Sequence, residues 1–328
     1  MASTVNTAFN EFNRDSVNLL KDRTDKARAS RTWLFTQLNG LDAKDDLDFP
    51  FKYEANHINF GSFERKTKIR ELDDVDLMFC LTADGATYTK YSNNLYQINT
   101  PNAGQRLKYL SDNNILNSKR VVNKVKNSLS KISQYSSAEL HSRGEAATLN
   151  LTSYEWVFDI VPCFYTDTGL YLIPDREGNW KPSDPRVDQT IVTNENQDKD
   201  GRLLQLIRTL KYWNRRNSTF TIGSYFFENL VINYSKSKSE LSQWIDYDIK
   251  NFFYFLSQAI WHSTFDPKGF QGDLNTFNYT EKLSISQKAE WAYQKASEAI
   301  KAETEEKDMK KSINLWREIF GSSFPQYT

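Results

Sequence analysis

Two apolar segments in the first half of the chain constrain the fold more than any other feature. Val75–Leu81 is apolar except for Asp76, and Glu155–Phe164 is mainly apolar but contains Asp159. Nearly continuous apolar runs of this length are typical of strands that are covered on both faces of a sheet. We therefore expect both segments to be buried strands of a sheet that is flanked by helices.

The remaining periodicity places further strands and helices along the chain. Shorter strands are predicted at His57–Phe60, which breaks at Gly61, and at Ala147–Leu151. Apolar residues at helical spacing predict helices at Ser3–Leu38 (one long helix, or two in series, ending near Gly40), Gln105–Asn113, Ser118–Ile132, Leu203–Asn214, Tyr225–Tyr234, Leu241–His262, Ile285–Ala302 and Met309–Ile319. The polar segment from Asp175 to Arg202 contains prolines and is expected to be a surface connection.

Strands therefore cluster in the first half of the sequence and helices in the second. This order predicts an α+β protein, with a mixed sheet and flanking helices in residues 1–185 and a helical lobe in residues 186–328. At this length, the chain is long enough for one large domain or two intimately joined ones, with ample apolar material for a core.

Charge and cysteine usage exclude several classes of protein. Lys plus Arg and Asp plus Glu both number 42, so the formal net charge is +0. This balance argues against a protein that coats nucleic acid or an acidic membrane through bulk electrostatics. Cys80 and Cys163 each lie in an apolar stretch and are interpreted as buried thiols. No stretch approaches about 18 apolar residues, and no signal-peptide pattern is visible, so a cytoplasmic protein without membrane contact is expected.

Three carboxylates crowd into four positions at the start of the strand Val75–Leu81. Side chains two positions apart on a strand point to the same side, so Asp74 and Asp76 project together and Asp73 is interpreted as a bystander. Such a pair can bind a divalent cation such as Mg²⁺, which takes its remaining ligands from water and substrate phosphate. A bare Asp-x-Asp pair, however, is more often an ordinary acidic turn before a strand.

Three further features favour a phosphate-binding metal site. Gly61–Ser62 precedes a helical turn that Ser62 could cap, and it offers backbone N–H groups and a hydroxyl to phosphate oxygens. Asp159 is expected inside an apolar strand, where an unpaired charge is costly, so it needs either a metal or a salt-bridge partner. The third feature is a stripe of cations on the helix Leu203–Asn214, at Arg208, Lys211 and Arg215. That stripe fits either a solvated face or a triphosphate clamp.

In chain order, the pattern is Gly-Ser, Asp-x-Asp at a strand start, one Asp on a later strand, and a helix that carries a lysine. Together with LIRTLKYWNRRN and TIGSYFFENLVINY, it resembles the cGAS/DncV-like branch of the DNA polymerase β-like nucleotidyltransferases, which comprises bacterial synthases of cyclic oligonucleotide signals. The resemblance spans about residues 9–275 and implies a nucleotidyltransferase core joined by a long N-terminal helix to a helical lobe. The sequence departs from the family where Lys66 precedes Thr67, because Gly-Thr is common there.

The resemblance implies a nucleotidyltransferase that uses two metal ions. Asp74 and Asp76 would hold both Mg²⁺ ions, which Mn²⁺ could replace, and Asp159 would complete the site that activates the attacking ribose hydroxyl. Gly61 and Ser62 would cradle the β- and γ-phosphates. Further nucleotide contacts are implied for Lys211, Ser224 and Tyr225.

The implied reaction joins nucleoside triphosphates such as ATP and GTP into a cyclic di- or trinucleotide, which a downstream effector senses in anti-phage (CBASS) signalling. Two alternatives remain open. One is a terminal nucleotidyltransferase acting on a tRNA, a small molecule or a protein, although we find no basic tract or RNA-binding appendage. The other is an inert scaffold or antitoxin-like binding protein, which would gain nothing from clustered acids.

Other conspicuous residues have a plainer interpretation. His57, His141 and His262 stand apart and are expected to be packed or surface residues, and only His57 lies near Gly61 in sequence. The basic run NSKRVVNKVKNSLSKIS raises the question of a nucleic-acid activator. The balanced overall charge and the lack of a zinc-ligand cluster argue against one.

Overall fold

The computed structural model describes residues 2–43, 48–216 and 220–328. It contains two compact units. The helical unit consists of Met1–Leu19, Lys66–Arg70 and Thr190–Thr328, and the sheet unit consists of Leu20–Arg65 and Glu71–Gln189. The predicted boundary at 185/186 lies close to the main division after Gln189. The N-terminal segment, however, groups with the helical unit and not with the sheet.

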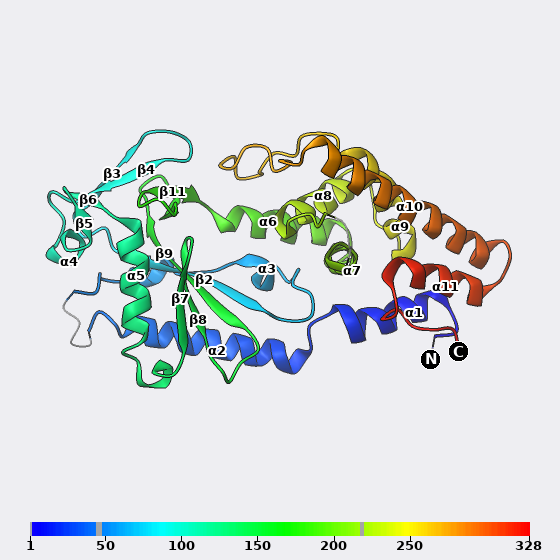
Figure 1. The fold of residues 1–328 in the computed structure, drawn as a ribbon, viewed down its shortest axis with the longest axis horizontal. Coiled ribbons are helices and arrows are strands. Elements are labelled where there is room, and N and C mark those ends of the chain that lie inside the picture. Colours follow the sequence, from blue (N-terminus) through cyan, green and yellow to red (C-terminus); the bar gives the residue numbers. More distant parts are fainter. Residues whose placement is uncertain (1, 44–47, 217–219) are drawn as a thin grey trace. The chain divides into compact units, whose positions relative to one another are not determined.

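One mixed sheet forms the centre of the sheet unit. Its main path runs β1-β2-β9-β10-β11-β4-β6-β5, with β3 paired to β4, β7 paired to β8, and β8 also paired to β9. The strands are β1 (Ile58–Asn59), β2 (Asp74–Leu81), β3 (Thr87–Lys90), β4 (Tyr96–Asn99), β5 (Ser111–Asp112), β6 (Ile115–Leu116), β7 (Glu139–Arg143), β8 (Ala146–Asn150), β9 (Val157–Tyr165), β10 (Tyr171–Pro174) and β11 (Trp180–Ser183). β2 and β9 run parallel and side by side (Figure 1).

The two apolar segments of the sequence are these central strands. β2 is buried from Leu77 onward and β9 is buried at most positions, as the apolar runs predict. Cys80 and Cys163 are free, buried thiols, which confirms their interpretation, and they lie opposite each other in the β2–β9 register. Burial raises the pKa of the Cys163 thiol, which favours its protonated, unreactive form.

Within the described residues, four α-helices lie wholly in the sheet unit. They are α2 (Lys21–Asn39), α3 (Gly61–Glu64), α4 (Gln105–Lys108) and α5 (Ser118–Leu129). α5 packs against β7 and β8 through an apolar face that includes Val121, Val125 and Leu129. The Asn117 side chain caps its first turn by accepting from the amides of Lys119 and Arg120.

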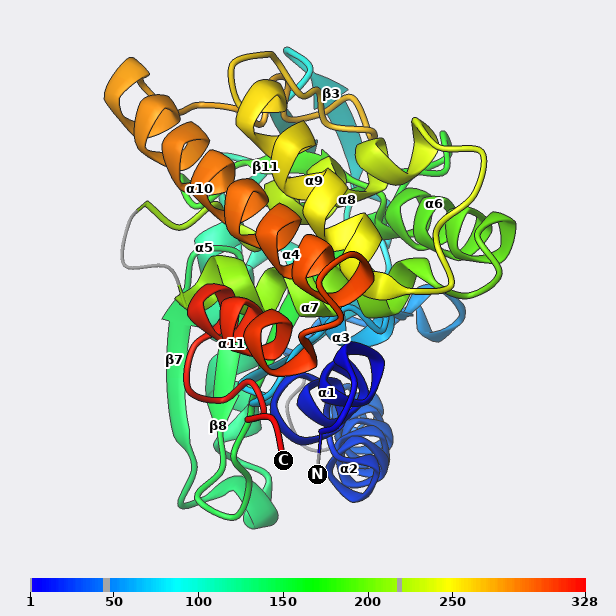
Figure 2. The same ribbon diagram turned by 90° about the vertical axis from the view of Figure 1, so that its right-hand side faces the viewer.

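Helices build the helical unit around an apolar core. They are α1 (Val5–Phe12), a π-helical turn (Asn13–Val17), α7 (Leu203–Arg216), α8 (Ser224–Lys236), α9 (Ile245–Ala259), α10 (Tyr279–Thr304) and α11 (Met309–Phe320), while α6 (Pro185–Asp198) carries the division between the units. α10 packs along α9 and α11 (Figure 2). The contact is close because α10 buries a stripe of alanines, including Ala289, Ala292 and Ala296.

The N-terminal helical pattern resolves into two helices in series, which was one of the two expected outcomes. The π-helical turn after α1 ends at Val17, and α2 then begins at Lys21 and is followed by Gly40 as its C-cap. α1 belongs to the helical unit and α2 to the sheet unit.

Three local predictions were wrong. The segment Asp175–Arg202 is not a loop, because it holds β11 and α6. The helix expected at Gln105–Asn113 ends at Lys108, and the chain then forms the β5–β6 hairpin, whose turn places Asn113 and Asn114 at φ 50° and 64°. Ser62 does not cap the turn after β1, since Phe60 is the N-cap residue and Ser62 lies within α3.

No helix in the described part of the chain combines the length and apolar content that crossing a membrane requires.

Candidate active site

The register of β2 and β9 brings the three candidate carboxylates onto one face of the sheet. Asp76 on β2 lies directly opposite Asp159 on β9, and Asp74 lies opposite Val157. Because residues two apart on a strand share a face, Asp74 projects to the same side as Asp76 and Asp159. Asp73 precedes the strand and is exposed. The sheet therefore gathers the three acids that the sequence singled out.

Asp159 is held from its other side by β8. Thr148 lies opposite Asp159 in the β8–β9 register, and its hydroxyl donates a 2.7 Å hydrogen bond to Asp159 Oδ1. Thr148 therefore helps to fix the orientation of Asp159.

Gly61 lies against the carboxylate of Asp76. A Cβ atom at this position would lie 1.8 Å from Asp76 Oδ2 and 2.7 Å from its Cγ. The backbone at Gly61 also has φ +78°, a conformation that disfavours other residues. Two independent constraints thus require glycine where α3 begins, and they place the Gly61–Ser62 turn beside the acidic face.

Lys66 occupies the place where the family often has glycine. Its φ is +61°, in the left-handed region that glycine adopts at little cost. For a lysine this conformation costs about 1–2 kcal/mol. The Lys66 carbonyl accepts a 2.8 Å hydrogen bond from Arg208 Nη1. The backbone therefore remains left-handed at this position although a lysine stands where the family often has glycine. The hydrogen bond from Arg208 helps to hold it in that conformation.

The donor chemistry of the acidic face fits Mg²⁺, because all three side chains offer carboxylate oxygens. The three side chains do not form a preorganised metal site. Among the described residues, no group of three or more His, Cys, Asp or Glu side chains is arranged so that it could hold a metal ion. In the structure, Asp76 turns towards Gly61 and Asp159 accepts from Thr148. The residues present therefore supply suitable ligands on a shared face.

The cationic stripe on α7 is engaged within the helical unit. Lys211 Nζ donates a 2.6 Å hydrogen bond to Glu228 Oε1 on α8, and both side chains are buried. Arg208 donates to Asn18 Oδ1 at 2.7 Å as well as to the Lys66 carbonyl. Burial lowers the pKa of Arg208 to about 10. Arg208 thus has a packing role, and Lys211 keeps other N–H donors beside its bond to Glu228.

Ser224 and Tyr225 open α8, as expected from the sequence. Ser224 is exposed at the first position of the helix. The Tyr225 hydroxyl donates to Asp266 Oδ1 at 2.7 Å and accepts from Lys268 Nζ at 2.6 Å. The Lys268 ammonium also lies 4.1 Å from the centroid of the Tyr225 ring. The ring is therefore held in place by a buried carboxylate and a cation.

Sequence reasoning missed the residues that hold the candidate side chains in place. Thr148, Glu228, Asp266 and Lys268 all act through partners that are distant in sequence. The alternation of side chains along a strand places Thr148 on one face of β8. It does not reveal that Asp159 lies opposite Thr148 on the neighbouring strand.

His57 is a packed residue and not part of a ligand cluster. Its Nδ1 accepts from the Cys80 amide at 3.1 Å, and its Nε2 is 2.8 Å from Asn39 Oδ1. The ring stacks on Phe35, with centroids 5.3 Å apart. These contacts fix the neutral tautomer that carries its proton on Nε2.

Comparison with known proteins decides the family. No family model matches the chain. A protein of Bacillus cereus (strain VD146), named a probable cyclic nucleotide synthase, is 43% identical over 334 residues, covering 100% of this chain and 99% of the relative. The chain belongs to the cGAS/DncV-like nucleotidyltransferase family. The protein is therefore a nucleotidyltransferase, as the resemblance in its sequence predicted.

Solved structures of the family share the fold. The Escherichia coli MS115-1 CdnC structure with ATP covers 98% of both chains at 18% identity and a TM-score of 0.71. CdnC in complex with HORMA has a TM-score of 0.69. The Vibrio cholerae DncV cyclic AMP-GMP synthase covers 99% of this chain and 98% of its own at 12% identity, with a TM-score of 0.72. The predicted α+β class is confirmed.

Proposed function

We propose that this chain joins nucleoside triphosphates into a cyclic di- or trinucleotide and releases pyrophosphate. The observation that carries the proposal is the shared face of Asp74, Asp76 and Asp159 in the β2–β9 register, with the Gly61 turn against Asp76. The named activity of the Bacillus cereus relative supports the same reaction.

The proposed reaction gives a role to each of the three acids on the shared face. The ribose hydroxyl oxygen bonds to the α-phosphorus and its proton leaves to solvent, while the bond from the α-phosphorus to the pyrophosphate oxygen breaks and pyrophosphate departs. Asp74, Asp76 and Asp159 would hold the metal ions, and Asp159, oriented by Thr148, would complete the site that activates the attacking hydroxyl. Bound Mg²⁺, or Mn²⁺ in its place, supplies charge neutralisation at the phosphates and activation of the nucleophile.

The proposal extends to substrate contacts and to biology. Gly61 and Ser62 would receive the β- and γ-phosphates, while Lys211, Ser224 and Tyr225 are assigned nucleotide contacts on the strength of the family resemblance. The substrates would include ATP and GTP. The product would act in the cytoplasm on a cyclic-nucleotide-sensing effector, in anti-phage CBASS signalling.

The test is incubation with labelled nucleoside triphosphates and Mg²⁺ or Mn²⁺, followed by phosphatase treatment and mass spectrometry. A phosphatase-resistant cyclic product supports the proposal. A linear polymer or a labelled acceptor would establish a terminal transferase instead, and the absence of any product would indicate an inert scaffold.

Replacing a single acid sharpens the test. Asp76→Asn should reduce synthesis by more than about 1,000-fold, because the loss of one shared ligand disrupts both metal positions. Glu177→Gln, at an exposed acid outside this face, serves as the control and should retain activity. Equal activity of Asp76→Asn and the control would refute the assignment of this face as the active site.

A further inference from the structure

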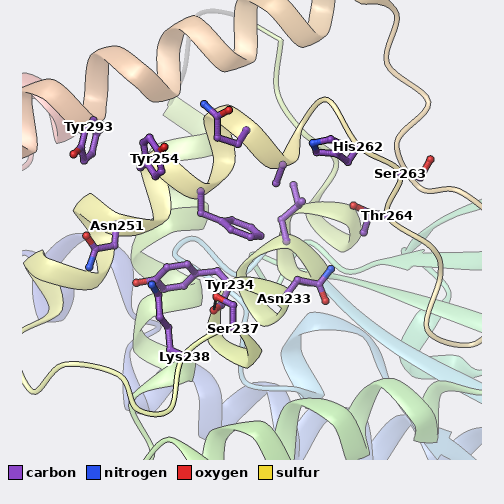
Figure 3. A pocket seen from close by; sticks show the side chains of 14 residues that line it. Asn233, Tyr234, Ser237, Lys238, Asn251, Tyr254, His262, Ser263, Thr264 and Tyr293 are labelled. Carbon is purple, nitrogen blue, oxygen red and sulfur yellow. Dashed lines mark hydrogen bonds between the residues drawn. The ribbon is translucent and has the colours of Figure 1, made fainter.

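A second candidate ligand site lies wholly within the helical unit. A cavity of about 610 Å³ opens between α8 and α9, with Tyr293 of α10 and the segment His262–Thr264 at its edges (Figure 3). Small-molecule sites commonly have volumes of about 300–1,000 Å³. The cavity is therefore large enough for a ligand of nucleotide size, and none of its lining comes from the sheet unit.

The charge of the lining favours an anion. Its fourteen residues include Lys238 and His262 but no Asp or Glu. Asp248, which is not part of the lining, interacts electrostatically with Lys238, but its oxygens accept hydrogen bonds from the Tyr234 hydroxyl (2.8 Å) and the Ser242 amide (2.7 Å). The ammonium of Lys238 is exposed and lies 5.4 Å from the centroid of the Tyr234 ring. A phosphate at this end would meet a cation without a competing carboxylate in the lining.

Aromatic rings supply a surface for a planar group. Tyr234 is buried, and its bond to Asp248 fixes the ring. Tyr254 is 53% exposed and lies beside Tyr293, with ring centroids 5.3 Å apart. Figure 3 shows both of these rings at the end of the cavity where Lys238 and Asn251 also lie. Nucleobases stack favourably on tyrosine rings of this kind.

The remaining polar groups suit a base edge and a sugar. Asn233, Asn251 and Gln258 carry amides that both donate and accept hydrogen bonds. His262, Ser263 and Thr264 lie at the opposite end of the cavity in Figure 3. Leu230 and Phe255 add apolar side chains to the lining. The cavity thus combines a cation, exposed aromatic faces and amides in one volume.

We propose that this cavity binds a nucleoside monophosphate. The base stacks on Tyr254, the amides of Asn251 and Gln258 contact the base edge, and Lys238 neutralises the phosphate. The site is separate from the acidic face of the sheet unit, and its existence does not depend on which product the enzyme makes.

The test is isothermal titration of the full chain with AMP, adenosine and inorganic phosphate. EDTA is included so that metal-free carboxylates of the acidic face repel phosphate. AMP should bind. Lys238→Ala should weaken AMP binding about two- to fivefold and leave adenosine binding unchanged, because only the phosphate meets the exposed ammonium. Tyr254→Ala should weaken AMP and adenosine alike.

Matched controls are Lys236→Ala on α8 and Tyr279→Ala on α10, which replace exposed residues outside the lining. Both should bind AMP as the unmodified protein does. The proposal is overturned if AMP does not bind at millimolar concentration, if Lys238→Ala and Tyr254→Ala bind it normally, or if Asp76→Asn abolishes binding. Failure of the synthesis assay would leave this result unaffected, so the two proposals fail independently.

Discussion

At the scale of single residues, Gly61 is the position where a substitution has the clearest consequence. In Gly61→Ala, the new methyl group would lie 1.8 Å from Asp76 Oδ2, so the carboxylate or the turn must move. A shift of about 1 Å near reacting groups can reduce the rate roughly 100-fold. We therefore expect Gly61→Ala to reduce cyclic product formation by about that factor, measured as initial rate at saturating nucleotide.

Gly201→Ala is the matched control for the backbone. Gly201 has the same φ of +78°, but a Cβ there would meet nothing within 4 Å. Both variants should lose about 1 kcal/mol of stability from left-handed strain, and only Gly61→Ala should lose activity. Equal loss of activity in both variants would show that strain, and not the contact with Asp76, limits synthesis.

His57 makes stability depend on pH in a defined window. Burial, with a smaller contribution from Lys52, lowers its pKa to about 4 from the ordinary 6.5. The unfolded chain therefore binds a proton at a pH where the folded protein does not. The contribution of His57 to stability is complete above about pH 6.5 and is lost as the pH falls towards 4, by at most about 3 kcal/mol. Urea unfolding at several pH values measures this loss.

His57→Gln should remove that pH dependence because glutamine does not titrate in this range. The comparison with the unmodified protein is necessary because Asp246 acts in the opposite direction. Burial, with a contribution from Glu303, raises the pKa of Asp246 to about 6. Its stabilising effect is lost as the pH rises towards 6. Identical pH profiles for His57→Gln and the unmodified protein would refute the role of His57.

At the scale of elements, the pairing of β8, β9 and β2 assembles the candidate site. Thr148→Val keeps the shape of the side chain and removes the 2.7 Å hydrogen bond to Asp159. Hydrogen bonds to charged groups contribute about 1.5–3 kcal/mol, so we expect synthesis to fall at least about tenfold with the fold retained. Thr148→Ser, which keeps the hydroxyl, should stay within about threefold of the original rate. Similar rates for Val and Ser at this position would contradict the proposed positioning role.

A strand or helix could be predicted from the sequence where a local pattern of apolar residues specifies it. β2 and β9 were predictable because their apolar runs are local, and the spacing of Asp74 and Asp76 fixed a shared face. α6 was mistaken for a loop because few of its side chains are apolar, although Pro185 at its first position is a recognised helix-start signal. The β5–β6 turn was missed because Asn113 was read as the end of a helix.

The partners of the site residues could not be predicted in the same way. The bonds from Thr148 to Asp159 and from Lys211 to Glu228 join different elements. Periodicity assigns a side chain to a face of its own strand or helix, but it does not say which element lies opposite. The need of Asp159 for a partner was foreseeable from its apolar surroundings, whereas the hydroxyl that satisfies it was not.

At the scale of the whole molecule, the balance of charge bears on regulation by nucleic acid. Lys plus Arg and Asp plus Glu both number 42. The basic run on α5 is partly neutralised, since Arg120 pairs with Asp112 at 2.6 Å and Lys119 lies 3.8 Å from Glu177. Binding to duplex DNA depends on cations that displace its counterions. A chain with neutral net charge and paired cations on this helix offers little of that driving force.

We therefore expect duplex DNA to leave cyclic product formation within about twofold of the rate without it, at low and at physiological salt. The measurement is the synthesis assay with and without DNA, with a gel-shift assay on the same samples. Asp112→Ala, which frees Arg120 from its ion pair, tests the reason: if pairing suppresses DNA binding, this variant should bind DNA more tightly at low salt. Stimulation of more than about tenfold that disappears as salt is raised would show instead that local cations suffice, because only phosphate contacts have that salt dependence.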